Sequence, residues 1–155
     1  MKNRGLIQLR IPVQFLGGIL GFLSVVLISF HGYQKGDSSS DILKMAILSL
    51  ILITIIVFYI QSQQAIFRDI PYFNLIFIFL YIVSQLLVLF TKGEAELHLW
   101  MLGGLSVAMF FDVTLGYLVT YSMIFMATFI GGLPIESIVF LLVVGTLLCM
   151  LSNYM

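Results

Sequence analysis

Charged side chains are scarce in this sequence, which contains seven Lys and Arg residues and seven Asp and Glu residues among its 155 positions. They make up 9% of the chain, whereas charged residues make up about 25% of a typical soluble domain. A soluble domain covers its core with such residues, so this chain has too few of them for a surface that faces water. Because 61% of the chain is hydrophobic, we expect most of its surface to face lipid.

Cysteine and the motifs of common catalytic sites are also scarce. Cys149 is the single cysteine, which excludes a disulfide framework or a cysteine metal cluster within one chain. We find no Ser/His/Asp or Cys/His set, no Gly-rich phosphate loop after a strand and no paired carboxylates on one helix face. The net charge of zero gives no reason to expect nucleic acid as a partner. We therefore expect no enzymatic activity, no cofactor and no metal site.

Long uncharged segments are the main feature that the sequence does contain. Five such segments reach the length of about 20 apolar residues that a helix needs to cross the bilayer, and a sixth is shorter. The long segments are 11–34, 45–67, 70–91, 113–135 and 137–155, and the short one is 97–111. We therefore predict an all-α, integral membrane helical bundle of about six transmembrane helices, in one membrane domain that covers residues 1–155, with the lipid bilayer as its main partner.

Polar and turn-forming residues set the expected helix ends. The polar segment 32–41 separates the first two helices, and Asp41 is placed to cap the second. Residues 97–130 are too long for one crossing and short for two, because they correspond to about 51 Å of helix. This length predicts a helical hairpin that turns at 111–114. The expected helices are about 11–31, 42–61, 71–91, 97–111, 114–131 and 136–153.

The positions of the basic residues predict the orientation in the membrane. The basic N-terminus precedes an apolar run that is longer than the core of a signal peptide, so we expect a retained signal anchor. Cytoplasmic loops are enriched in Lys and Arg. With the N-terminus inside, four basic residues are cytoplasmic and three are external, namely Lys2, Arg4, Arg10 and Arg68 against Lys35, Lys44 and Lys92. We expect a multi-pass protein of the cell membrane with both termini in the cytoplasm.

Several polar residues within the apolar segments are candidate functional positions. Asp112 is the only acid deep in the apolar region, and an ionisable group there is a functional candidate by default. Alternatively, Asp112 marks the hairpin turn and caps the helix that follows it. Asn74 and Gln85 can form hydrogen bonds between helices and, together with His98 and Asp112, could line a substrate cavity.

Gly17 and Gly21 form a GxxxG pair in the first helix. Small residues at this spacing let a second helix approach closely, although the pattern also arises by chance in membrane helices that tolerate glycine. The pair is therefore a candidate helix-packing face.

From Leu50 onward, the order of features resembles the membrane region of the bacterial seven-transmembrane HD-domain phosphohydrolases. The segment 56–60 (IVFYI) leads to 67–69 (FRD), and the hairpin 100–112 (WMLGGLSVAMFFD) continues into 113–117 (VTLGY). A further helix with a central small residue follows, here around Gly145. The resemblance implies a module of the bacterial inner membrane that anchors a signalling protein or senses for it.

The chain also departs from that family. Its members carry a large extracellular domain after the first helix, where this chain has only residues 32–41. They also have two more helices and a cytoplasmic HD domain whose His and Asp residues bind the catalytic metals, and this sequence shows neither. No catalytic residue can therefore be carried over from the resemblance.

Three functions remain open. The first is a non-enzymatic multi-pass module, the sensing or anchoring part of a signalling protein that contacts a membrane-protein partner. The second is a small transporter, or the substrate-binding subunit of one, although the sequence shows no internal repeat of the kind common in carriers. The third is an envelope scaffold, because residues 103–116 also look like part of the rod-shape-determining membrane scaffold family, in which the motif lies nearer the N-terminus.

Overall fold

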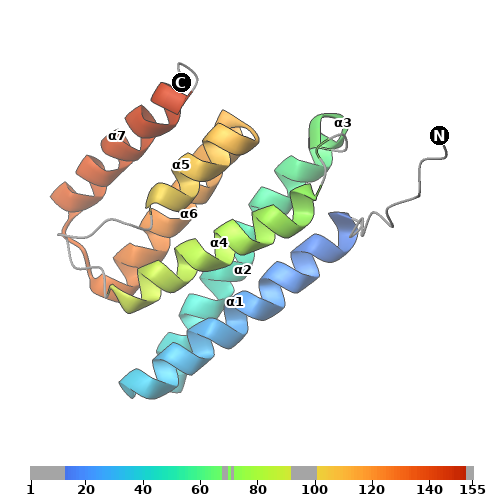
Figure 1. The fold of residues 1–155 in the computed structure, drawn as a ribbon. Helices are drawn as coiled ribbons and strands as arrows, with labels where there is room; N and C mark the ends of the chain where they lie inside the picture. The colour runs from blue at the N-terminus through green and yellow to red at the C-terminus, as the bar shows by residue number, and fades with distance from the viewer. Residues whose placement is uncertain (1–12, 68–69, 71, 92–100, 153–155) are drawn as a thin grey trace, which may run out of the picture.

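The computed structural model describes residues 13–67, 70, 72–91 and 101–152, and these residues form seven helices and no strands (Figure 1). The helices are α1 (Val13–Lys35), α2 (Ser39–Ser62), α3 (Gln64–Phe67), α4 (Phe73–Phe90), α5 (Met101–Phe110), α6 (Val113–Gly131) and α7 (Ile135–Leu151). Four of them, α1, α2, α4 and α6, are long and apolar enough to cross a membrane, and α5 and α7 are shorter apolar helices. The prediction of an all-α helical bundle is confirmed.

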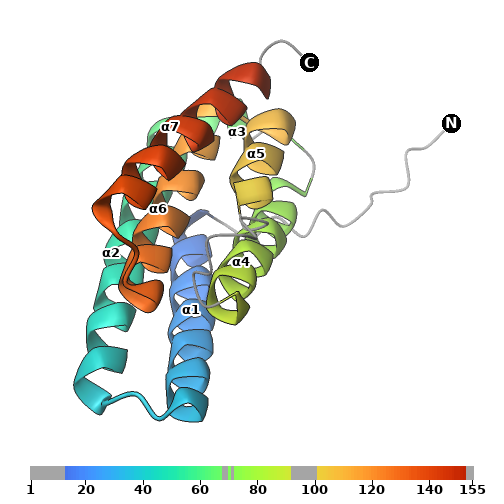
Figure 2. The same cartoon turned by 90° about the vertical axis from the view of Figure 1, so that its left-hand side faces the viewer.

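Six of the helices, all except α3, form two groups that pack side by side (Figures 1 and 2). In the N-terminal half, α1 packs against both α2 and α4. In the C-terminal half, α5, α6 and α7 pack against one another. Contacts of α6 with α2 and α4, and of α4 with α5, join the halves. The short helix α3 and the α5–α6 turn lie at the same end of the bundle, which we call the α3 end.

The outer surface of the bundle is apolar. Large hydrophobic side chains on different helices are exposed, among them Phe22 of α1 at 71%, Phe58 of α2 at 73% and Phe140 of α7 at 61%. A soluble monomer rarely exposes such continuous apolar surface, whereas a bilayer covers it at no cost. The helix lengths and this surface identify a membrane-embedded protein.

The first turn of the bundle lies later than the sequence predicted. α1 continues through Gly32 to Lys35 instead of ending near residue 31. Gly32 lies inside α1 and against α2, since an added Cβ there would lie 2.5 Å from Cγ1 of Ile42. The chain leaves the helix at Gly36, whose φ of 77° lies in the left-handed region that glycine adopts without strain.

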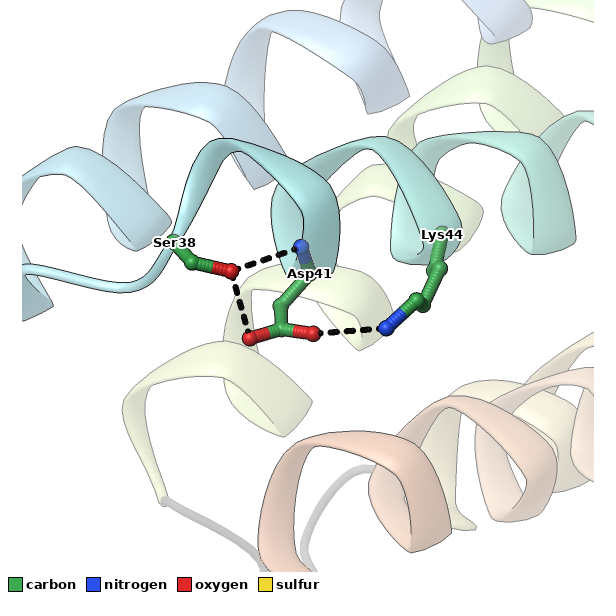
Figure 3. A network of polar contacts seen from close by, with 3 residues as sticks. All are labelled: Ser38, Asp41 and Lys44. Atoms are coloured by element: carbon green, nitrogen blue, oxygen red, sulfur yellow. Dashed lines mark hydrogen bonds and ion pairs between the residues drawn. The ribbon is translucent and has the colours of Figure 1, made fainter.

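The prediction that Asp41 caps the second helix is wrong, because α2 begins at Ser39 and Ser38 is its N-cap (Figure 3). The Ser38 hydroxyl accepts a hydrogen bond from the Asp41 N–H at 3.2 Å and donates one to the Asp41 carboxylate at 2.7 Å. Lys44 contacts the other carboxylate oxygen at 3.0 Å. Asp41 therefore lies in the first turn, where a negative charge complements the positive end of the helix dipole.

The expected hairpin is present, with small differences at its ends. α5 and α6 meet at a turn through Phe111 and Asp112, and α6 begins at Val113. Residues 97–100, which the prediction included in the first helix of the hairpin, lie outside the described residues. Gly132 caps the end of α6 with a φ of 61°, and Pro134 precedes α7. The end of α6 and the start of α7 lie within one residue of the predicted bounds, 131 and 136.

Candidate functional site

Asp112 connects the two halves of the bundle at the α3 end. It is the N-cap of α6, where its Oδ2 accepts a hydrogen bond from the Leu115 N–H at 2.9 Å. The same oxygen accepts a hydrogen bond from the hydroxyl of Tyr59, near the end of α2, at 2.8 Å. The interpretation of Asp112 as a helix cap is confirmed, and the structure adds a link to α2 that the sequence did not indicate.

Aromatic rings pack beside this link. Phe67 of α3 stacks on Phe73 of α4, with ring centroids 4.6 Å apart. Phe73 in turn meets Phe111 of the α5–α6 turn edge to face at 4.8 Å. Such pairs favour one relative position of their rings beyond the apolar area that they bury. We call Tyr59, Phe67, Phe73, Phe111 and Asp112 the α3-end junction, because these residues join both halves at this end.

Three of the four polar positions predicted from the sequence are described by the structure, and they lie at two depths. Asn74 follows Phe73 in the first turn of α4 and therefore lies at the α3 end, as Asp112 does. Gln85 lies eleven residues further along α4, a rise of about 16 Å. His98 lies outside the described residues. The described residues therefore place Asn74 and Asp112 at one end and Gln85 deeper in the bundle.

Gln85 belongs to a group of buried polar side chains in the N-terminal half. The Ser24 hydroxyl of α1 donates a hydrogen bond to Gln85 Oε1 of α4 at 2.6 Å. Tyr81, one turn before Gln85 on α4, and Ser49 of α2 are buried as well. Ser24 and Ser49 are 0% exposed, and Tyr81 and Gln85 are 1% exposed. We call these four residues the mid-bundle polar cluster.

Sequence reasoning found only one member of this cluster, Gln85. Two serines in the middle of apolar helices were a weak signal, because a single serine is common in such helices. The spacing of Tyr81 and Gln85, four residues apart, was a better signal since it places both on one helix face. The partner of Gln85 on α1, Ser24, could not be identified without the packing of the helices.

Small residues dominate the contacts of the C-terminal half. Thr120 of α6 lies between Gly104 of α5 and Gly145 of α7, and an added Cβ at either glycine would collide with its side chain. Thr120 Oγ1 also contacts the Cys149 sulfur at 3.6 Å. The free cysteine is thus a small buried residue of the α6–α7 contact.

Gly17 and Gly21 lie on the face of α1 that packs on α2. An added Cβ at Gly17 would lie 3.3 Å from Cγ2 of Val57, and one at Gly21 would lie 3.0 Å from Cδ2 of Leu50. Both neighbours are side-chain methyl groups and not backbone atoms. The two glycines allow close packing, but less close than in the C-terminal half.

Among the described residues, His, Cys, Asp and Glu do not gather in groups of three or more that could hold a metal ion. No protein-family model matches this chain, and no curated protein and no solved structure matches it either.

Proposed function

We propose that this chain is a non-enzymatic, multi-pass module of the cell membrane, and that it forms the sensing or anchoring part of a signalling protein. The observation that carries this proposal is the hydrogen bond between Tyr59 and Asp112 at 2.8 Å. The proposal is therefore supported by the geometry of this contact. No family model matches the chain, so the family comparison adds no support to the resemblance to the HD-domain phosphohydrolases.

This hydrogen bond suits a relay between the halves of the bundle. Tyr59 belongs to α2 in the N-terminal half, and Asp112 belongs to the turn between α5 and α6 in the C-terminal half. A shift of one half against the other at this end would lengthen or break the bond. Membrane and soluble switches use such contacts, which have two discrete arrangements, to pass a change from one element to another.

The orientation predicted from the basic residues makes the α3 end the cytoplasmic end. With the N-terminus inside, the start of α1 faces the cytoplasm, and α3, the α5–α6 turn and the end of α7 lie at that same end (Figure 1). The exposed side chain of Gln64 in α3 then faces the cytoplasm next to the α3-end junction. A protein partner would contact this end, and the α1–α2 turn would face outward.

In-cell photo-cross-linking tests this proposal. A photoreactive residue at Gln64 is expected to form an adduct with a protein that carries a cytoplasmic signalling domain. The matched control is a photoreactive residue at Gln34, which is also exposed and lies near the end of α1 at the opposite end of the bundle. Adducts from position 34 alone would contradict the orientation, and the absence of adducts from both positions would contradict the signalling role.

A small carrier is the second candidate, and one observation favours it. The mid-bundle polar cluster places hydrogen-bonding groups inside the bundle, where a carrier binds its substrate. Proteoliposomes that contain the purified chain would then show saturable uptake of a polar solute. Gln85→Leu would abolish this uptake, whereas Gln64→Leu, at the surface, would leave it unchanged. The relay proposal predicts no such uptake.

A further inference from the structure

The lipid-facing surface of α2 is bounded by polar side chains at both ends. Lys44 is exposed near the start of the helix, where it pairs with Asp41, and Gln61 is exposed near its end. The exposed side chains between these positions are apolar except for Thr54, whose hydroxyl donates to the Leu50 carbonyl of the same helix. Lys44 and Gln61 are seventeen positions apart, which corresponds to a rise of about 26 Å.

The surface of α7, in the other half of the bundle, has nearly the same height. Glu136 is exposed in the first turn of this helix, and Ser152 follows its last residue. They are sixteen positions apart, a rise of about 24 Å. The exposed side chains between them are all apolar, namely Val139, Phe140, Val143, Leu147, Met150 and Leu151.

Exposed tyrosines lie near the same two levels. Gly32 of α1 lies against Ile42 of α2, so the neighbouring Tyr33, which is 84% exposed, lies near the level of Lys44. Tyr72, which is 52% exposed, precedes α4 at the α3 end. Tyrosine is enriched where membrane proteins meet the boundary between lipid and water. The tyrosines and the polar ends of α2 therefore indicate the same two membrane surfaces.

We propose that the lipid-facing surface of this protein preferentially binds phospholipids whose acyl chains form a thinner bilayer than average. The hydrocarbon core of a typical bilayer is about 30 Å thick, which exceeds the apolar height of α2 and α7 by about 5 Å. Acyl chains of that length would cover the charged group of Lys44 or Glu136, at a cost in free energy. Helix tilt does not remove this mismatch, because it shortens the projected apolar height further. Shorter acyl chains do remove it.

This proposal concerns only the lipid-facing surface and does not depend on the proposed signalling role. Fluorescence quenching by a brominated phospholipid tests it on the full chain in phosphatidylcholine bilayers. Trp100, the only tryptophan of the sequence, is replaced by Phe, and Phe140→Trp places a single probe on the exposed face of α7. Unbrominated lipids with monounsaturated chains of sixteen or twenty carbons then compete with the brominated lipid for this surface.

We expect the sixteen-carbon lipid to bind about threefold more strongly than the twenty-carbon lipid. Phe58→Trp in place of Phe140→Trp repeats the measurement on α2, where Phe58 is 73% exposed. Equal binding of the two lipids, or stronger binding of the twenty-carbon lipid, at either position would overturn the proposal.

Two substitutions of Glu136 separate the height of the apolar surface from other causes of selectivity. Glu136→Leu extends this surface, because the neighbouring Ile135 is apolar and 72% exposed. We expect the Phe140→Trp probe to lose its preference for the shorter lipid in this variant. Glu136→Gln is the matched control, since it keeps a polar group at the same level and should keep the preference. An unchanged preference in Glu136→Leu, or an equal loss in Glu136→Gln, would overturn the assignment of Glu136 as the boundary. The Phe58→Trp probe should keep its preference in both variants, which verifies that they are folded.

Discussion

The two halves of the bundle hold their helices together by different means. In the N-terminal half, large and polar side chains fill the space between helices, with Tyr81 and Phe77 among the largest fully buried residues. In the C-terminal half, small residues let the backbones approach closely, as at Gly104 and Gly116. A close backbone contact has no room to adjust, whereas a side-chain contact can rearrange. The C-terminal half is therefore the stiffer support, and the N-terminal half is the part that can shift against it.

The largest expected effect comes from adding one methyl group to the C-terminal half. In Gly116→Ala, the new Cβ would lie 2.9 Å from the backbone nitrogen of Ala108, which cannot move without displacing α5. We expect the free energy of unfolding in mixed micelles to fall by about 3 kcal/mol. Gly21→Ala is the matched variant in the N-terminal half, where the new Cβ meets only the end of the Leu50 side chain at 3.0 Å. An equal loss of unfolding free energy in both variants would contradict the claim that helix contacts in the C-terminal half are the less adaptable ones.

Removal of the carboxylate that joins the halves is expected to have the next largest effect. Asp112→Ala removes the cap of α6 and the hydrogen bond from Tyr59, which together lower the free energy of unfolding by about 2 kcal/mol. Asp112→Asn retains an oxygen that can cap the helix, so it should lose less than half as much. The same denaturation experiment measures both variants, and an equal loss in the two would show that capping is not the role of Asp112.

A smaller effect is expected when only the link between the halves is removed. Tyr59→Phe keeps the ring and the cap of α6 but loses the hydrogen bond to Asp112, at a cost of about 1 kcal/mol. Tyr33→Phe is the control, because Tyr33 is 84% exposed. Combining Tyr59→Phe with Asp112→Ala in a double-mutant cycle gives the coupling energy of the pair. Strictly additive losses would contradict a direct link.

The smallest expected effect is at the turn between α1 and α2, away from the contact between the halves. Ser38→Ala removes the hydroxyl that caps α2, and we expect a loss of about 0.5 kcal/mol because the site is exposed. Ser40→Ala is the control, because Ser40 lies in the first turn of α2 but is not its N-cap. Thermal unfolding followed by circular dichroism compares the two. A larger loss from Ser40→Ala would contradict the assignment of Ser38 as the cap.

Much of the fold was predictable because the bilayer imposes a length on each apolar helix. The hairpin at Asp112 followed from an apolar segment too long for one crossing, with one acid inside it that could cap a helix. The turn before α2 was less predictable, since Ser38 and Asp41 are both good capping residues and local sequence does not choose between them. Gly32 also looked like a helix end, but α1 continues through it to Lys35, and Gly32 lies close to Ile42 of α2.

The candidate positions were predictable as polar residues in apolar helices, but their roles were not. Gln85 needs a partner in the membrane interior, yet the sequence offers many serines and threonines that could supply one. The choice of Ser24 depends on how α1 rotates against α4. In the same way, nothing local to Asp112 indicates that Tyr59 lies within hydrogen-bond distance of it.

By itself, the sequence determined that the chain is a helical protein of the membrane and where most of its helices begin and end. Those features depend on hydrophobicity, segment length and turn chemistry, which act along the chain. Only the tertiary structure decided which polar groups meet and which glycines face a backbone, because these depend on the rotation and register of neighbouring helices. In lipid, many registers bury similar apolar area, so a few small residues and hydrogen bonds select among them.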